Sequence, residues 1–455
     1  MGSEHRTEEV EAFLAKNPEI ERFDMIYSDL CNLWRGKRLD RAGIRKLFED
    51  GAALPGAVFL LDVTGDSCDP GGRGYSDGSP DHWCYPVPGA LARVPWATHP
   101  TAQVLISVHE TDGTPFDASP RNVLARVIER LADLPGTLCI AAELEFYLID
   151  PERDEAGFPQ APVMPGSRTR ADSRQVFSMA DLDAAGPFLD AVTEACSAQG
   201  IPASMASSEY APAQMEINLH HVDNALLAAD HAVLLQRVIK ACARKIGLEA
   251  TFMAKPFMTE EGNGLHFHIS HYSEDGENLF DNGTDLGSQH LHHAIGGLGA
   301  TMGEAMAIFG PNVNAFRRLS QSLFAGTTFS WGANNRWTSV RLPVEGGKAR
   351  RLEHRVAGAD ANPYLTLAAI LAGMHHGITN KIDPGPPQIG DKRPTGGSIA
   401  TTWQKAIDAL DGATVLRDYL GSHYVDIYVA TKQGELNKFY GLPSKLEYDW
   451  YLGSQ

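Results

Sequence analysis

The sequence predicts an α+β protein with two domains, a small β-rich domain followed by a larger domain with a mostly antiparallel sheet. The chain has 455 residues, which is too long for one small core and suits two domains. Its 43% hydrophobic and 21% charged residues are typical of a soluble globular protein. Beyond about residue 116, strand and helix patterns follow one another in an order that favours an α+β domain with a large sheet.

Charge and cysteine usage exclude several classes of protein. The net charge of −18 argues against a nucleic-acid partner, which would need a basic stripe. Six cysteines lie far apart without a CxxC pair, which indicates reduced thiols in the cytoplasm and neither a disulfide framework nor a zinc site. The first twenty residues lack the apolar core of a secretory signal, and no apolar stretch is long enough to span a bilayer. We therefore expect a cytoplasmic protein without a membrane partner.

The N-terminal domain is predicted to cover residues 1–115. Its expected elements are an acidic helix that stops near Asn17-Pro18, strands at 23–30 and 33–38, a helix at 41–50 and a strand at Ala102–His109. Between them, residues 51–100 are rich in Gly, Pro and Asp, with apolar islands at Val58–Val63 and Leu91–Trp96. This composition predicts a small β-rich domain with long loops.

The larger domain is predicted to cover residues 116–455. It opens with Ser119-Pro120, a serine cap with proline at the first helical position. Expected helices lie at Asp181–Gln199, Asp223–Ile246, His290–Ile308, Asn362–His376 and Thr401–Leu410. Expected strands lie at Leu138–Ile149, Met215–His220, Ala250–Lys255 and Leu265–His271, and the run from Lys348 to Arg355 is also interpreted as a strand.

Four of these strands carry polar residues spaced by two, which places each set on one face of a sheet. The sets are Glu143 and Glu145; Gln214, Glu216 and Asn218, preceded by Glu209; His266, His268 and Ser270; and Arg351, Glu353 and Arg355. A face with five carboxylates and two imidazoles would repel itself without cations. It therefore predicts a site for hard divalent ions, Mg²⁺ or Mn²⁺. For each set alone, the alternative is a solvated strand face or an ion-pair ladder.

A second group of residues is cationic. It comprises Arg318, Arg336, Arg341, Lys348, Arg351 and Arg355. Cations beside a metal-binding face are the arrangement that phosphoryl transfer uses. No Walker loop and no GxGxxG loop accompanies them. The alternative interpretation of these cations is surface solubility.

Here the sequence resembles the glutamine synthetases of type I, and within them the γ-glutamylpolyamine synthetase branch. The motifs that carry the resemblance are Glu143-Leu-Glu145-Phe, Glu209-Tyr-Ala-Pro-Ala-Gln-Met-Glu216, Lys255-Pro-Phe, Gly264-Leu-His266-Phe-His268, Asn335-Arg336 and Arg351-Leu-Glu353-His-Arg355. The resemblance implies a β-grasp N-terminal domain on a catalytic domain. It also implies a homo-oligomer of six-membered rings, usually two stacked, with each active site between neighbouring subunits.

Roles follow from the resemblance, position by position. Glu145, Glu209 and Glu216 would hold a metal ion nearer the glutamate, and Glu143, His266 and Glu353 one nearer the phosphates of ATP. The nucleotide would bind to His268, Ser270, Lys348 and Arg351. The phosphates in transfer would bind to Arg336 and Arg341. The glutamate carboxylates would bind to Gly262, Arg318 and Arg355. The implied reaction transfers the γ-phosphoryl of ATP to glutamate, after which an amine displaces phosphate.

The chain departs from the ammonia-using members at the amine site. Six residues after Arg318, where the resemblance implies an ammonium-binding glutamate, the sequence has Phe324, and residues 319–332 contain no acidic residue. An apolar wall there favours an alkyl or aryl amine over ammonia. The alternatives are an ordinary glutamine synthetase and a catalytically inactive relative. Which amine is used stays open, and so does the role of Glu261.

The base that deprotonates the amine is also open. Asp62 is the candidate that the resemblance offers, in an N-terminal strand that a neighbouring subunit would present. With Arg318 and Arg336, it completes the set of candidate catalytic residues. The alternative for Asp62 is a structural turn aspartate before Val63-Thr64-Gly65.

Overall fold

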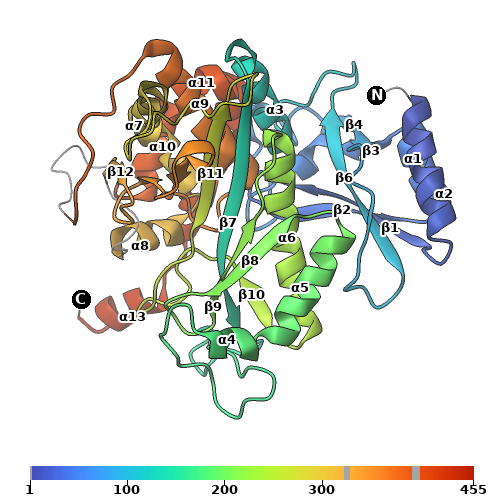
Figure 1. The fold of residues 1–455 in the computed structure, drawn as a ribbon. Coiled ribbons are helices and arrows are strands. Elements are labelled where there is room, and N and C mark those ends of the chain that lie inside the picture. Colours follow the sequence, from blue (N-terminus) through green and yellow to red (C-terminus); the bar gives the residue numbers. More distant parts are fainter. Residues whose placement is uncertain (1–2, 322–327, 392–399, 455) are drawn as a thin grey trace.

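The computed structural model describes residues 3–321, 328–391 and 400–454. Figure 1 shows the N-terminal domain at one end of the molecule and the larger sheet running through the middle, with helices packed beside it. The α+β class predicted from the sequence is confirmed. The domain boundary between residues 115 and 116 stays a prediction.

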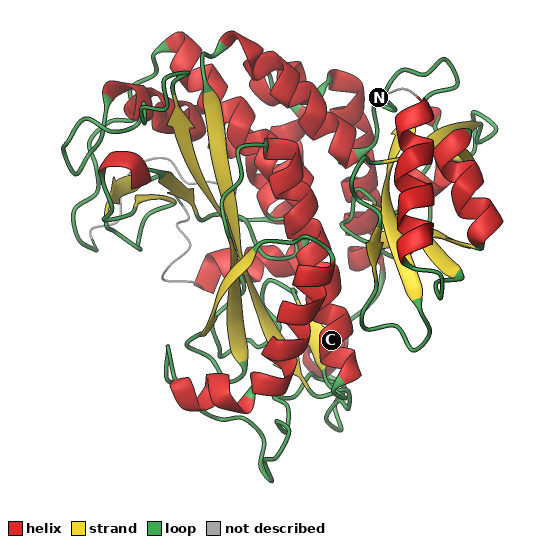
Figure 2. Cartoon of the chain, turned by 45° about the vertical axis from the view of Figure 1, so that its right-hand side comes forward, coloured by secondary structure: helices red, strands yellow, loops and turns green. Residues whose placement is uncertain are grey.

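Within the described residues, the N-terminal sheet has six strands, in the order β2-β1-β6-β4-β3 with β5 paired to β6. They are β1 (Arg22–Ser28), β2 (Trp34–Leu39), β3 (Ala52–Pro55), β4 (Asp81–Pro86), β5 (Ala92–Arg93) and β6 (Thr101–His109). Strands β1 and β6 run parallel, and the other pairs are antiparallel. The helices α1 (Ser3–Lys16) and α2 (Arg41–Glu49) lie side by side against this sheet, which makes the β-grasp domain (Figure 2).

The larger sheet has eight strands within the described residues, in the order β12-β13-β14-β11-β7-β9-β8 with β10 paired to β7. They are β7 (Thr137–Ile149), β8 (Ala203–Ser208), β9 (Gln214–Leu219), β10 (Glu249–Thr251), β11 (Leu265–Tyr272), β12 (Trp331–Ala333), β13 (Val340–Leu342) and β14 (Leu352–His354). Among the strands that the structure describes in this sheet, β12 and β13 are the only parallel pair. The prediction of a mostly antiparallel sheet is therefore confirmed.

Some helices of the larger domain begin with side-chain caps, but the cap predicted at Ser119 is wrong, since its side chain makes no cap hydrogen bond to α3 and only Pro120 at the first helical position holds. The Asn362 side chain accepts a hydrogen bond from the Tyr364 amide, and Pro363 occupies the first helical position. The helices are α3 (Pro120–Arg130), α4 (Met179–Ala184), α5 (Gly186–Ala198), α6 (Ala225–Lys245), α7 (Gln289–Phe309), α8 (Val313–Gln321), α9 (Pro363–Asn380), α10 (Trp403–Asp411), α11 (Val415–Leu420), α12 (Ser422–Gly441) and α13 (Lys445–Tyr451). Short 3₁₀ turns lie at Gly56–Phe59, Pro70–Gly72, Leu131–Asp133 and Gly347–Ala349.

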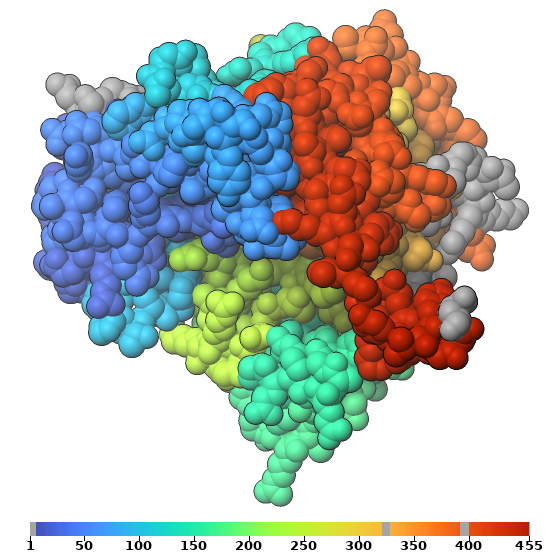
Figure 3. Space-filling model, turned by 180° about the vertical axis from the view of Figure 1, so that it is seen from behind, coloured from blue at the N-terminus to red at the C-terminus, as the bar shows by residue number. Residues whose placement is uncertain are grey.

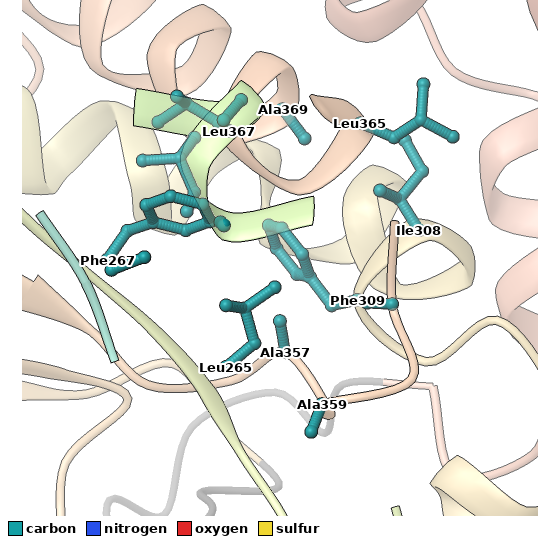
Figure 4. Close-up of a cluster of buried hydrophobic side chains, with 14 of the residues drawn as sticks. Leu265, Phe267, Ile308, Phe309, Ala357, Ala359, Leu365, Leu367 and Ala369 are labelled. Atoms are coloured by element: carbon teal, nitrogen blue, oxygen red, sulfur yellow. The ribbon is translucent and has the colours of Figure 1, made fainter. Parts of the chain in front are cut away.

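One face of the larger sheet forms the core of its domain. Leu265 and Phe267 of β11 are completely buried, and Figure 4 shows them in one cluster with Phe309 of α7 and with Leu365 and Leu367 of α9. Because side chains alternate along a strand, His266 and His268 lie on the opposite face. The helices therefore cover one face of the sheet and leave the other for polar side chains.

Four predictions about elements are wrong in detail. The island Val58–Val63 begins in a 3₁₀ turn and is not a strand. The helix predicted at Asp181–Gln199 is divided at Ala185 into α4 and α5, because Pro187 starts a new helix there. The strand predicted at Ala250–Lys255 shrinks to the three residues of β10, and the Lys348–Arg355 strand to the three of β14.

The C-terminal helices join the two domains. Ile427 of α12 belongs to the N-terminal hydrophobic core, and Figure 3 shows the C-terminal segment against the N-terminal domain. Among the described residues, no helix is both long and apolar enough to cross a membrane.

Candidate functional site

Strand pairing brings the polar sets together on the open face of the larger sheet. Glu143 of β7 lies opposite His266 of β11 on one side and opposite Asn218 of β9 on the other. Two residues along β7, Glu145 lies opposite Glu216 of β9. On the other side of β11, His268 lies opposite Glu353 of β14. The sequence spacing of two and the sheet order together build this cluster.

The cluster contains two overlapping groups of possible metal ligands. They are Glu143, His268 and Glu353, and Glu143, Glu216 and His266, and within each group the ligand atoms all lie within 4.8 Å of one another. Glu143 belongs to both groups. Its Oε1 lies 2.9 Å from His268 Nε2, and its Oε2 lies 3.4 Å from His266 Nδ1. The carboxylate of Glu143 therefore lies between the two imidazoles.

Glu353 is held between two guanidinium groups. Arg341 Nη1 donates to its Oε2 at 2.8 Å, and Arg355 Nη1 donates to its Oε1. Burial alone would raise the pKa of Glu353. The charges of Arg355, His268 and His266 outweigh burial and lower this pKa to about 2. Glu353 is therefore ionised at neutral pH, although its side chain is only 1% exposed.

Two other carboxyl groups have the opposite shift. Burial, followed by the charge of Glu145, raises the pKa of Glu209 to about 7. Burial and the charges of Glu143 and Glu145 raise the pKa of Glu216 well above its ordinary value. Carboxyl groups crowded together cannot all ionise without a cation. This half of the cluster therefore has too little positive charge nearby to offset burial and the neighbouring carboxylates.

The donor set fits hard divalent cations. Carboxylate oxygens are the ligands that Mg²⁺ and Mn²⁺ prefer, and Mn²⁺ also accepts imidazoles. Of the five predicted carboxylate ligands, Glu143, Glu216 and Glu353 belong to the two groups, whereas Glu145 and Glu209 belong to neither among the described residues. His268 Nε2 is buried and has no hydrogen-bond partner among the described residues, although a carboxylate oxygen lies near it. A nitrogen placed in this way is available to a cation.

A cleft of about 570 Å³ opens beside the cluster. Glu143 and His268 border it on the cluster side, and Lys348 and Arg351 bring positive charge to it. Arg351 Nε donates to His268 Nδ1 at 3.0 Å, and the Ser270 hydroxyl donates to the Arg350 carbonyl at 2.9 Å. The other residues that line the cleft are Cys139, Ala141, Ser204, Met205, Asn218, Leu219, His220, His221, Ser270, Tyr272 and Ala349. The cleft suits an anionic ligand whose charged end faces the cluster.

Arg318 lies on the other side of the cluster, against a glycine loop. Its guanidinium donates to the Val356 carbonyl at 2.9 Å and is buried. A Cβ at Gly262 would lie 2.7 Å from Arg318 Cγ, and a Cβ at Gly264 would lie 2.9 Å from Arg318 Nη2. Gly264 also donates its amide to Glu145 Oε2 at 2.5 Å. A side chain at Gly264 would therefore displace site side chains, and one at Gly262 would also meet the Ala254 backbone oxygen at 2.5 Å, so glycine at Gly262 lets Arg318 lie here.

No role was predicted for Gly264 from the sequence, although it begins the Gly264-Leu-His266-Phe-His268 motif. A Cβ there would lie 2.6 Å from His266 Nε2, so this position is sterically part of the cluster. The available signal was a glycine directly before the histidine strand, at a place where the backbone approaches a functional group closely.

Two predicted site residues, Arg336 and Asp62, make no contact with this cluster in the part of the chain that the structure describes. Arg336 is exposed in the connection between β12 and β13, where buried Asn335 anchors the loop by donating to the Gln388 and Gly390 carbonyls. Phe324 lies outside the described residues. Asp62 lies in a turn and accepts hydrogen bonds from the Thr64 amide and hydroxyl and from Lys438 Nζ. These contacts favour the turn role for Asp62 over the role of a free base.

Comparison with known proteins shows which family model, relatives and solved structures this chain matches. Residues 117–451 match the model of the glutamine synthetase catalytic domain. The chain is 38% identical to the gamma-glutamylputrescine synthetase PuuA of Escherichia coli (strain K12), over 98% of this chain and 94% of that protein. It is 32% identical to the glutamate–isopropylamine ligase of a Pseudomonas species, over 93% of each chain. The ligand-free structure of GmaS matches with a TM-score of 0.83 and 28% identity, over 97% of this chain and 99% of that one.

Proposed function

Because this chain belongs to the glutamine synthetase family, we propose that it is an ATP-dependent ligase that joins the γ-carboxylate of glutamate to a primary amine. The observation that carries this proposal is the carboxylate and imidazole cluster, bordered by Arg341 and Arg355 and open to a cleft with two more cations. The arrangement places negative ligands for cations next to positive ligands for phosphates.

The ions that this cluster would hold are Mg²⁺ or Mn²⁺, two or more in each site. Glu145, Glu209 and Glu216 would bind one ion, and Glu143, His266 and Glu353 another. When bound, such ions neutralise developing phosphate charge and polarise the phosphoryl oxygens. His268 lies near enough to Glu143 to belong to the same cluster, which supports a role for it in cation binding as well as at the nucleotide.

ATP would occupy the cleft beside the cluster. Lys348 and Arg351 line this cleft and would bind phosphate oxygens, and Ser270 lies on its wall. Arg341 reaches the same region through Glu353, with its Nε buried and without a partner among the described residues. Arg336 would join the phosphates from its exposed loop. Guanidinium groups suit this task because they bind phosphate in a bidentate manner.

Glutamate would bind on the other side of the cluster, between Arg318, Arg355 and the loop that contains Gly262. Arg318 would bind the α-carboxylate, and Arg355 the γ-carboxylate. A γ-carboxylate oxygen then bonds to the γ-phosphorus of ATP as the bond to ADP breaks. The amine nitrogen, after losing a proton to a base, forms the amide bond as phosphate leaves.

The amine is proposed to carry carbon and not to be ammonia. Phe324 and the absence of any acidic residue in the sequence from 319 to 332 support this proposal, as do the names of two relatives that use putrescine and isopropylamine. The test is ADP release with ATP, glutamate and a panel of amines that includes ammonia, isopropylamine, putrescine, spermidine and ethanolamine. We expect one or more carbon-bearing amines to exceed ammonia in kcat/KM. Turnover with ammonia alone would instead make the protein an ordinary glutamine synthetase, and no turnover an inactive relative.

A single substitution tests the amine pocket. We expect Phe324→Glu to raise kcat/KM for ammonia and to lower it for the preferred amine, because a carboxylate binds a small cation and removes apolar space. Steady-state kinetics with both amines measures the change in preference. If both values stay at the wild-type level, Phe324 does not line the amine pocket.

We also propose a cytoplasmic homo-oligomer built of hexameric rings, in a dodecamer where two rings stack. Six free cysteines support the cytoplasmic location. Exposed large apolar side chains at the C-terminal end, including Leu446, Trp450 and Leu452, support a contact with another subunit. Light scattering after gel filtration gives the number of subunits directly.

A further inference from the structure

The loop before β11 carries two carboxylates that the roles proposed above leave unused, those of Glu260 and Glu261, and Glu261 is the one without a partner among the described residues. The loop backbone is firmly held. The Tyr147 hydroxyl donates to the Glu261 carbonyl at 2.6 Å, and Gln214 Nε2 donates to the Gly262 carbonyl and to Asn263 Oδ1, each at 3.1 Å. The half-buried Glu261 carboxylate, in contrast, makes no hydrogen bond and no ion pair with any described residue.

Two cations lie beside the residues that flank Glu261 and form no salt bridge with it among the described residues: Lys255 donates to the Glu260 carbonyl, and Arg318 lies against Gly262, the residue that follows Glu261 in the chain. Burial lowers the pKa of Lys255, and among the neighbouring charges that of Glu261 opposes this shift most strongly. Burial also lowers the pKa of Arg318, which the charges of Glu145, Asp360 and Glu261 partly restore; Asp360 already accepts a hydrogen bond from Asn312 at 2.7 Å. Opposite charges therefore lie near each other here but are not joined in a salt bridge.

A zwitterionic substrate matches this arrangement. The α-carbon of glutamate carries an ammonium group next to a carboxylate, and burying either charge requires a partner. Arg318 supplies the cation. The carboxylates of Glu145, Glu209 and Glu216 are assigned to metal ions, and Glu260 is paired with Arg174 at 2.5 Å. Glu261 is the remaining anion on this loop.

We propose that the Glu261 carboxylate binds the α-ammonium group of glutamate while Arg318 binds the α-carboxylate. This inference rests on the proposed function, because it concerns the glutamate site of that reaction. It assigns Glu261 to amino-acid recognition: a dicarboxylic acid without the ammonium group would gain nothing from Glu261 and would be repelled by it.

The experiment compares glutamate with glutarate, which lacks only the amino group. Binding of each is measured by calorimetry on the full-length protein with Mg²⁺ and a non-hydrolysable ATP analogue. We expect Glu261→Gln to weaken glutamate about 10- to 100-fold, the range for a hydrogen bond between charged groups. Glutarate should bind the variant at least as tightly as it binds the wild type. Glu261→Asp, which keeps the charge, should recover part of the preference for glutamate.

The matched control is Glu260→Gln, which removes the neighbouring carboxylate from the same loop and should leave the glutamate-to-glutarate ratio unchanged. An unchanged ratio in Glu261→Gln, or an equal loss in Glu260→Gln, overturns the assignment. So does a ratio that Glu261→Asp fails to recover. Because binding is measured without turnover, these outcomes are independent of the amine panel. Ligase activity with an unchanged ratio rejects Glu261 alone, whereas normal selectivity without ligase activity rejects the proposed reaction.

Discussion

At the scale of single residues, the site depends on how the negative charge of each carboxylate is balanced by nearby positive charge. Glu353 is compensated by protein cations, since it contacts both Arg341 and Arg355. For Glu209 and Glu216, burial and the neighbouring carboxylates raise the pKa values more than Ser207, Arg355 and Asn218 lower them. The same sheet face therefore has one half that is already neutralised and another half that needs an added cation.

The first prediction concerns Glu353, whose charge is balanced by Arg341 and Arg355. Glu353→Gln should abolish ADP release and lower the free energy of unfolding by about 3 kcal/mol, because two buried guanidinium groups lose their anion. Chemical denaturation and an ADP assay measure the two effects. Glu345→Gln is the control: its carboxylate is 52% exposed and lies 3.2 Å from Arg351, so its removal should cost less than about 1 kcal/mol. Near-normal ADP release by Glu353→Gln would exclude Glu353 from the cation site.

The second prediction concerns Glu209 and Glu216, whose negative charge is not fully balanced by protein cations. Glu209, with a pKa near 7, and Glu216 bind protons in the metal-free protein, and a cation must displace them. Mg²⁺ affinity should therefore rise with pH between 6 and 8, by about tenfold per pH unit for each proton displaced. Calorimetry in two buffers of different ionisation enthalpy measures the protons released. A pH-independent affinity would contradict this account.

The same shift has a consequence for stability. Because the folded-state pKa of Glu209 exceeds the ordinary value of 4.5, its contribution to stability is complete below 4.5 and is lost as the pH rises through about 7. Added Mg²⁺ should therefore raise the thermal midpoint more at pH 8 than at pH 6, which a thermal-shift assay with and without chelator measures. This readout needs no activity.

At the scale of elements, the site depends on the glycine loop between β10 and β11. Gly262 has no room for a side chain, since a Cβ would lie 2.5 Å from the Ala254 carbonyl oxygen and 2.7 Å from Arg318 Cγ. The backbone oxygen cannot move away without shifting the loop. Any larger residue must displace Arg318.

The element-scale prediction is that Gly262→Ala raises the KM for glutamate about 10- to 100-fold and leaves the KM for ATP nearly unchanged, because only the Arg318 side of the site is displaced. Gly303→Ala in α7 is the matched control. A Cβ at Gly303 meets nothing within 4 Å, so this change should leave the kinetics alone and stabilise the helix by up to about 1 kcal/mol. Equal rises in both KM values for Gly262→Ala would point to a general loss of structure.

Long elements with one buried face were predictable from the sequence. Along β11, Leu265, Phe267 and Ile269 alternate with His266 and His268, and this pattern alone placed the histidines on the polar face. Strands of three residues, such as β12 and β13, are too short to show an alternation of apolar and polar residues, so they were not predicted. Helix α12 was also missed, because it is buried on more than one side and has no single apolar stripe.

The arrangement of the site was predictable in part. Spacing by two grouped the ligands within each strand, but strand order, which depends on long-range pairing, decides that Glu143 touches both imidazoles. The unequal pKa shifts of Glu353 and Glu209 likewise depend on burial and on neighbours from other strands. Asp62 shows the limit most clearly, since its partner Lys438 is 376 residues away in the chain.

At the scale of the whole molecule, helix α12 forms hydrogen bonds and ion pairs that join the N-terminal domain to the larger one. Glu435 accepts a hydrogen bond from the Val63 amide at 3.0 Å, and Lys438 contacts Asp62 and lies 2.9 Å from Asp66. Lys432 and Glu435 form a buried ion pair at 3.1 Å on the same helix. The turn around Asp62 is therefore part of the contact between domains.

The whole-molecule prediction is that Asp62→Asn lowers the free energy of unfolding by about 1 kcal/mol, a modest value because Lys438 is partly exposed. It should leave kcat and its pH profile unchanged. Burial would raise the pKa of Asp62, but Lys438 and Thr64 lower it, so this contribution is present at neutral pH and is lost in acid. A large fall in kcat with unchanged stability would restore Asp62 as the base.

The central position of β7 also constrains the order of events during folding. Its Glu143 lies beside residues from β11 and β14, and the latter is separated from β7 by most of the larger domain in sequence. The chain entropy lost in closing such long loops is recovered only once many other contacts have formed. A cation thus finds no ligand set on a partly folded chain. A cation therefore binds only after the sheet has formed. It should slow unfolding and have little effect on the folding rate.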